Sequence, residues 1–273
     1  TTVGASSHHI YSRAPGVIDP NTTWEKVESR NIGLDFGFFN NALTGTLDIF
    51  QRDTKDMLGP SVDFPDMFGA QAPDTNNARL RNRGWELSLN WRGKIGSDID
   101  YSVGGSLSDA TAEVTEYENP TGSDPAGKWY VGRKVGEIWG YRTGGLIQTQ
   151  AEADEYNKYD LSYLSGKAWE PGDVKYLDLD DDKAINRGAN TLEDMGDMTI
   201  IGNTTPRYQY TFNGSISWKG LSLSMMFQGV GKRDWNPGTA PYFWGWGPYA
   251  QVTVFNEHMD YWREDNPGAY LLG

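Results

Sequence analysis

The sequence contains no cysteine, which excludes disulfide frameworks, thiolate metal sites and cysteine nucleophiles. Basic residues are also scarce, because 24 Lys and Arg stand against 37 Asp and Glu and leave a formal net charge of -13. A nucleic-acid partner is therefore not expected, since phosphate binding requires a basic face. No apolar run approaches the roughly 20 residues of a membrane-spanning helix. The histidines, His8, His9 and His258, show no metal-ligand spacing.

Glycine and aromatic residues, in contrast, are abundant. The 273 residues include 33 Gly and 11 Trp, and aromatic residues make up 13%. This composition favours short strands and turns, and hence an all-β fold. The mean hydropathy of -0.63 is polar. A polar average does not exclude membrane strands, because a barrel strand turns only every second residue toward lipid.

Strict alternation of apolar and polar residues predicts three β-hairpins. The first joins residues 31–38 to 43–50 through a turn at 39–42, and the second joins 85–91 to 100–107. The third joins 208–218 to 221–228 through a tight turn at Lys219 and Gly220. One face of the first hairpin carries Ile32, Leu34, Phe36, Phe38, Leu43, Leu47 and Ile49.

Aromatic residues and unequal connections indicate a membrane barrel. Phe38, Trp85, Trp91, Tyr208 and Trp218 are expected at strand ends on the apolar face, where the two interfaces of a bilayer favour aromatic side chains. Turns within hairpins are short, whereas residues 51–80 and 110–207 form long polar connections. The expected fold is a partial transmembrane antiparallel β-barrel, about six strands of a larger barrel with long extracellular loops. A secreted β-sandwich or propeller is the alternative from the pattern alone.

The polar strand faces are expected to line the lumen of the barrel. Glu86 and Asp100 on these faces could be interpreted as a glycosidase pair, but alternating carboxylates arise without catalysis in any acidic barrel. We therefore expect no enzyme. The predicted lumen residues include Asp35, Asp48, Glu86, Asn90, Asp100 and Asn213.

Alternating carboxylates at Asp178, Asp180 and Asp182 predict a loop similar to calcium-binding loops, which supply hard oxygen ligands. Lys183 stands where such loops place a turn glycine, and Ala189 stands at the twelfth position. A closing carboxylate would have to come from Glu193, Asp194 or Asp197. A solvated acidic loop is the alternative interpretation, since charge runs are usually solvated. No cofactor other than calcium is expected.

An aromatic segment follows the third hairpin and is a candidate ligand-binding site, because flat aromatic faces stack on sugar rings. Packing within the loop or against another protein is the alternative. A short helix is also expected at residues 152–155 in an external loop. The candidate ligand-binding residues are Trp235, Tyr242, Trp244, Trp246 and Tyr249.

An ordered series of segments resembles the C-terminal barrel of SusC/RagA-type TonB-dependent outer-membrane transporters of Bacteroidota. The segments are T-W-E-K at 23–26, N-I-G-L-D-F-G-F-F-N-N-A-L-T-G-T-L-D at 31–48, N-R-G-W-E-L-S-L-N-W-R at 82–92, V-G-R-K-V-G-E-I-W-G-Y-R-T-G-G-L-I-Q-T at 131–149, P-G-D-V-K-Y-L-D-L-D-D-D at 171–182 and I-I-G-N-T-T-P-R-Y at 200–208.

The resemblance implies that residues 1–273 are part of one TonB-dependent receptor barrel domain, with the plug domain and the final strands absent from the chain. Six strands alone cannot close a barrel when the smallest have eight. The implied function is active import of a glycan or peptide through the outer membrane. Implied partners are a SusD-like surface lipoprotein, the TonB complex through the missing N-terminal part, an oligosaccharide or peptide ligand, and outer-membrane lipid. A secreted carbohydrate-binding or hydrolytic β-protein and a diffusion porin are the alternatives.

Overall fold

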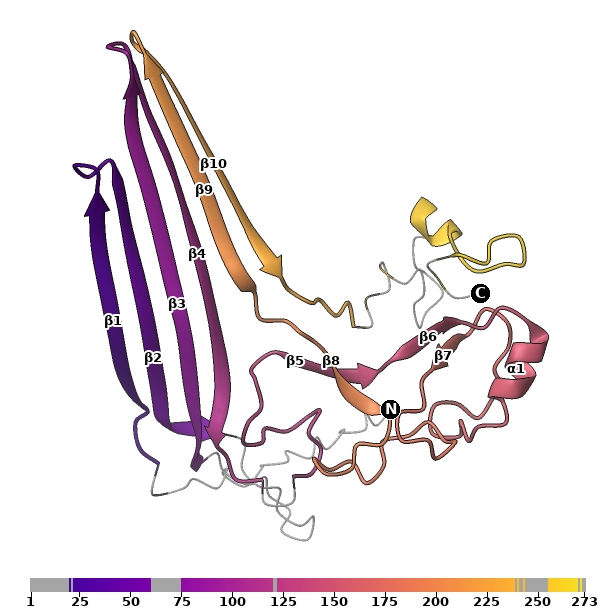
Figure 1. Cartoon of the computed structure of the whole chain (residues 1–273). Coiled ribbons are helices and arrows are strands. Elements are labelled where there is room, and N and C mark those ends of the chain that lie inside the picture. Colours follow the sequence, from indigo (N-terminus) through magenta and orange to yellow (C-terminus); the bar gives the residue numbers. More distant parts are fainter. Residues whose placement is uncertain are drawn as a thin grey trace, which may run out of the picture.

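The structure consists of a long β-sheet and a loop-rich unit beside it (Figure 1). It is a computed structural model that describes residues 20, 22–59, 75–119, 122–238, 240, 243, 255–269 and 271.

None of the helices in this part of the chain is both long enough and apolar enough to cross a membrane.

Six antiparallel strands form the long sheet in the order β1-β2-β3-β4-β9-β10. Their register keeps the apolar residues on one face, because Ile32 pairs with Ile49 and Ile49 pairs with Trp85. Within the described strands, β1 and β10 form the two edges and do not pair with each other, so the sheet is an open barrel wall. The strands are β1 (Lys26–Phe38), β2 (Leu43–Gly59), β3 (Thr75–Ile95), β4 (Ile99–Glu116), β9 (Arg207–Trp218) and β10 (Leu221–Lys232).

The three predicted hairpins are confirmed, and their turns follow from local sequence. Lys219 and Gly220 both have positive φ, at 45° and 87°, as a two-residue hairpin turn of type I′ requires. In the β1–β2 turn, Asn40 and Asn41 also have positive φ, a conformation that asparagine tolerates better than most residues. The all-β antiparallel fold is confirmed with them.

The predicted strand boundaries were wrong at the end of the sheet that bears the long connections. β2 continues to Gly59, β3 begins at Thr75 and β4 reaches Glu116, so the connections are shorter than residues 51–80 and 110–207. Ion pairs between neighbouring strands replace apolar contacts there, for example Arg81 Nε to Asp53 Oδ1 at 2.6 Å. Because these extensions are polar, apolar alternation could not reveal them. Trp85 consequently lies inside β3, at the end of the apolar stretch and not at the end of the strand.

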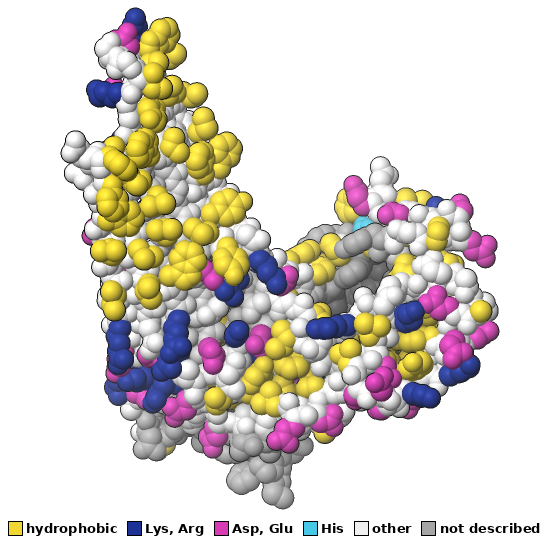
Figure 2. Space-filling view, in the orientation of Figure 1, with side chains coloured by type: hydrophobic (Ala, Val, Ile, Leu, Met, Phe, Trp, Pro, Cys, Tyr) yellow, Lys and Arg dark blue, Asp and Glu magenta, His cyan; other side chains and the backbone are white. Residues whose placement is uncertain are grey.

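The apolar face of the sheet is exposed to a degree that a folded core would not allow. Ile32 is 79% exposed, Leu221 is 70% exposed and Phe227 is 61% exposed. Figure 2 shows hydrophobic side chains covering the upper part of the sheet, and Lys and Arg side chains gathering where that surface ends toward the loops. The sheet therefore buries little of its own apolar surface.

The loop-rich unit lies between β4 and β9 in sequence and contains two small antiparallel sheets. β5 (Glu137–Tyr141) pairs with β8 (Met198–Asn203), and β6 (Thr143–Leu146) pairs with β7 (Val174–Tyr176). Helix α1 (Gln150–Tyr156) confirms the predicted short helix. The side chain of Thr149 caps it by accepting a hydrogen bond from Glu152 N at 3.2 Å. A 3₁₀ helix, η2 (Asn256–Met259), lies near the C-terminal end of the chain.

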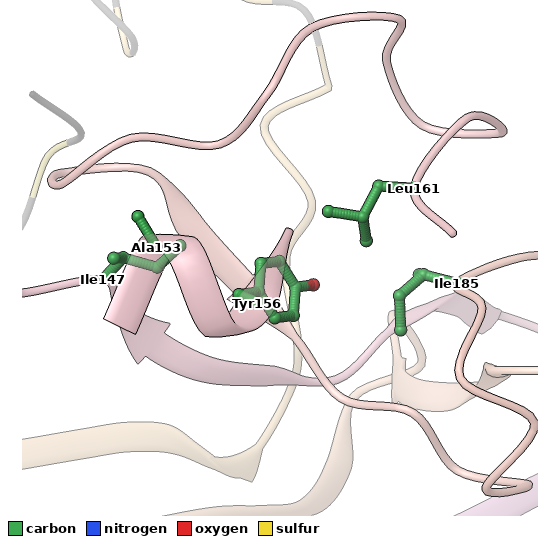
Figure 3. Packing of buried hydrophobic residues seen from close by; sticks show 5 residues of the cluster. All are labelled: Ile147, Ala153, Tyr156, Leu161 and Ile185. Atoms are coloured by element: carbon green, nitrogen blue, oxygen red, sulfur yellow. The ribbon is translucent and has the colours of Figure 1, made fainter. Parts of the chain in front are cut away.

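A compact apolar cluster holds this unit together. Ile147, Ala153 and Ile185 are fully buried, and Tyr156 projects from α1 toward Leu161 and Ile185 (Figure 3). The Tyr156 hydroxyl donates to Tyr176 O at 3.0 Å and accepts from Tyr176 N at 2.9 Å. Burial raises the pKa of Tyr156 to about 12. The unit is thus packed around a buried apolar core.

Candidate functional site

The polar face of the long sheet is the first candidate surface. The register places the predicted lumen residues on one face of the sheet. For example, Asp48 pairs with Glu86, and Gly104 pairs with Asn90 on one side and with Asn213 on the other. Serine hydroxyls link the strands across this face, for example Ser102 Oγ to Ser215 Oγ at 2.8 Å. Such a face can hydrogen-bond to water and to polar ligands.

Glu86 and Asp100 do not meet on this face. Lys94 Nζ binds Asp100 Oδ1 at 3.1 Å, and Glu86 lies eight residues before Lys94 on the same strand. At about 3.4 Å per residue that separation is roughly 27 Å, far beyond the spacing of a glycosidase pair. The structure therefore provides no catalytic geometry for these two carboxylates.

An acidic cluster in the loop-rich unit is the second candidate site. One carboxylate oxygen from each of Asp178, Asp180 and Asp197 lies within 4.8 Å of the others. Asp178 and Asp180 are thus brought together as the sequence predicts, and Asp197 completes the group as one of the three proposed closing carboxylates. Asp182 instead accepts a hydrogen bond from Ala184 N at 2.7 Å through Oδ1.

Backbone amides hold the acidic cluster in place. The fully buried Asp197 accepts hydrogen bonds from Leu179 N at 2.6 Å and from Asn186 N at 2.9 Å. Lys183, which replaces the expected glycine, has a positive φ of 62°. Its amide donates to Asp178 Oδ2 at 3.0 Å. The loop therefore has a defined shape that its own hydrogen bonds maintain.

The electrostatics of the cluster favour a positive charge. Loss of hydration raises the pKa of Asp180, and the carboxylates of Asp182, Asp197 and Asp178 raise it further. Carboxylate oxygens are the ligands that calcium prefers. Calcium binding here stays a prediction.

The aromatic segment is described only in part, since Tyr242, Trp244, Trp246 and Tyr249 lie outside the described residues. Trp235 is 60% exposed. Its ring contacts Phe243 edge-on, with centroids 5.4 Å apart. The exposed part of Trp235 is accessible to a ligand, while the contact with Phe243 is the packing expected of the alternative. Ligand binding by this segment stays a prediction.

Sequence reasoning missed charged side chains on the apolar face, at the loop end of the sheet. Arg30, Arg81 and Arg83 continue the alternation of the apolar residues, so the register places them on this face once the strands are known to extend that far. Arg207 pairs with Asp109 through Nε and Nη2, at 2.5 Å each. Those two residues are 98 positions apart in sequence, and no local pattern connects them.

Comparison with known proteins gives a consistent result. A family model described as TonB dependent receptor-like, beta-barrel matches residues 4–263. TonB-dependent receptor P26 of Formosa agariphila is 25% identical over 260 residues, which are 91% of this chain and 24% of that protein. TonB-dependent receptor SusC of Bacteroides thetaiotaomicron is 33% identical over 111 residues, 40% of this chain and 11% of that protein.

A solved structure shows the same fold. The chain aligns with a structure of the RagAB peptide transporter at a TM-score of 0.61 and 24% sequence identity, covering 93% of this chain and 26% of that one. The chain spans about a quarter or less of the length of the curated relatives that it matches.

Proposed function

The chain belongs to the TonB-dependent receptor-like β-barrel family, and on that premise we propose that it forms part of the wall of an outer-membrane barrel that imports nutrients. One observation carries the proposal, namely an exposed apolar face that stays in register across all six strands of the long sheet. Lipid is the solvent that such a face requires. The remaining strands of the barrel would pair with the open edges of β1 and β10.

The energetics support a lipid environment. Each large apolar side chain that leaves water contributes about 1.5–3 kcal/mol. The outward face presents many of them, among them Ile32, Leu34 and Ile216, which are all more than two-fifths exposed. Left in water, this surface would be an aggregation site. Inside a bilayer, the same side chains stabilise insertion.

The long connections support an extracellular position for the loop-rich unit. Outer-membrane barrels have short periplasmic turns and longer extracellular loops. Here β1–β2, β3–β4 and β9–β10 close in short turns at one end of the sheet, and the loop-rich unit lies at the other end (Figure 1). The loop-rich unit with its acidic cluster, and Trp235 just beyond the end of β10, would then face the medium.

We propose that the cargo is an oligosaccharide or a peptide, captured with a surface lipoprotein and driven by TonB. Similarity to SusC and to the RagAB peptide transporter supports this class of cargo. Transport requires no catalytic residue in this chain, and the polar inner face supplies hydrogen-bonding groups along the path. A strain lacking the gene is expected to lose growth on one oligosaccharide or oligopeptide of a tested panel, as is a strain lacking TonB. Uptake that is independent of TonB would favour a diffusion porin.

Adjacent residues of β10 provide a matched test of the barrel position. Leu223 lies on the apolar face and Ser224 on the polar face, and both are exposed. Leu223→Arg in the full-length protein is expected to destabilise the barrel by about 2–4 kcal/mol in lipid vesicles, because the charge would enter the bilayer. Ser224→Arg is the control and is expected to stay within about 0.5 kcal/mol. Equal effects in a urea titration would contradict a lipid-facing sheet and favour a secreted β-protein.

A further inference from the structure

A polar layer borders the apolar face of the sheet at its loop end. Gln51 of β2 pairs with Arg30 of β1 and with Arg83 of β3, one alternation step beyond the apolar row of Ile32, Ile49 and Trp85. We call Arg30, Gln51 and Arg83 the arginine rim. All three side chains therefore point to the same side of the sheet as the lipid-facing residues.

Cations farther from the apolar face are neutralised by carboxylates. Lys55 Nζ binds Glu28 Oε1 at 2.5 Å, and Lys26 Nζ binds Asp56 Oδ2 at 2.9 Å. Arg81 binds Asp53, and Arg79 Nε binds Glu116 Oε2 at 3.2 Å. This part of the surface carries little net charge.

The arginine rim is different. Arg83 Nε donates to the neutral Gln51 Oε1 at 2.9 Å. The Arg30 guanidinium lies 3.8 Å from Glu28, a carboxylate that Lys55 already holds. Among the described residues, the two arginines beside the apolar face therefore have no carboxylate of their own. The chain has a net charge of -13 and an excess of carboxylates, so two neighbouring arginines whose carboxylate contact is limited to this one long, shared ion pair are a local exception.

The rim and the apolar row line one open groove of about 690 Å³. Its apolar lining includes Ile32, Ile49 and Trp85, and its polar lining includes Arg30 and Arg83. The other charged group in the lining, Asp109, is neutralised by Arg207. The groove is thus apolar on the membrane side and cationic on the loop side, which is the pattern that an anionic amphiphile complements.

We propose that this groove binds a phosphorylated glycolipid of the outer leaflet, with its phosphate on Arg30 and Arg83 and an acyl chain on Ile32, Ile49 and Trp85. Guanidinium groups bind phosphate through strong, charge-assisted hydrogen bonds. β1 and β3 are two strand spacings apart, roughly 10 Å, so the two arginines can bracket one headgroup. The inference rests on the proposed function, because the long extracellular connections place the rim at the outer leaflet.

The test measures binding of purified diphosphoryl lipid A to the delipidated full-length protein in detergent. The double variant Arg30→Gln with Arg83→Gln is expected to bind lipid A about tenfold or more weakly, since it loses the charge-assisted hydrogen bonds to the phosphate. Arg52→Gln with Arg92→Gln removes the same charge from the opposite face and is expected to bind as the unmodified protein does. Dephosphorylated lipid A is expected to bind the unmodified protein and the rim variant alike.

Two outcomes would overturn the proposal. The first is unchanged lipid A binding in the rim variant, and the second is binding of phosphatidylglycerol as tight as that of lipid A. Recovery of the unmodified protein in the outer-membrane fraction separates this failure from that of the proposed function. A protein recovered outside the membrane would overturn both, whereas a membrane barrel with unchanged lipid binding would overturn only the glycolipid site.

Discussion

The long sheet and the loop-rich unit handle apolar surface in opposite ways. In the unit around α1, Ile147, Ala153 and Ile185 are inaccessible to solvent, and Tyr156 satisfies its hydroxyl internally. On the long sheet, Ile32 and Leu221 are 79% and 70% exposed. The chain therefore combines an exposed apolar face on the sheet with a buried apolar core in the loop-rich unit. The hydrophobicity of the residues alone does not distinguish the two regions. The spacing of the apolar residues in the sequence and their burial in the fold do.

The largest loss of stability is expected from truncating a side chain in the core of the loop-rich unit. Ile185→Ala is expected to destabilise the unit by about 2–5 kcal/mol, because a fully buried side chain leaves a cavity. Hydrogen exchange of the 147–185 amides in the full-length protein measures it. Ile32→Ala on the sheet is the control and leaves no cavity. Equal exchange in both variants would contradict a packed core.

A smaller effect is expected from the buried hydroxyl of Tyr156. Tyr156→Phe leaves Tyr176 N and Tyr176 O without their partner and is expected to cost about 1–3 kcal/mol. Tyr163→Phe is the control, because Tyr163 is 54% exposed. Amide exchange at Tyr176 reports the difference. Similar protection in the two variants would show that the hydroxyl does not anchor β7.

The same residue makes the unit sensitive to alkaline pH. The pKa of Tyr156 is raised from 10.0 to about 12, so the folded state favours the neutral phenol. Its contribution to stability is complete below pH 10 and is lost as pH rises through about 12. Amide protection, measured relative to the unfolded chain at the same pH, is expected to fall across this range in the unmodified protein and to change less in Tyr156→Phe. A parallel response in both would assign the pH dependence to other groups.

The smallest expected effect comes from calcium. If calcium binds Asp178, Asp180 and Asp197, a concentration ten times the Kd would stabilise the unit by about 1.4 kcal/mol. Asp180→Asn is expected to abolish this gain, and Asp154→Asn on the exposed surface of α1 is the control. Protection of the 178–186 amides measures it. A lack of response to calcium would identify a solvated acidic loop.

The sequence allowed the sheet to be predicted because its signals are local. Alternation around Ile32 and Ile49 places the apolar face, and Lys219 with Gly220 identifies the tightest turn. The strand ends were missed because Asp53, Arg81 and their neighbours pair by charge, which carries no apolar period. Asp197 lies 17 residues beyond Asp180, so only the fold could show that it, and not Asp182, joins Asp178 and Asp180.

The central claim is that the outward face of the sheet lies in lipid, and spin labelling tests it most directly. The chain contains no cysteine, so single cysteines can be introduced at residues 221–227 without background labelling. In lipid vesicles, labels at 221, 223, 225 and 227 are expected to be accessible to oxygen. Labels at 222, 224 and 226 are expected to be accessible to a polar nickel complex. Uniform accessibility to the nickel complex along β10 would contradict a sheet that faces lipid on one side.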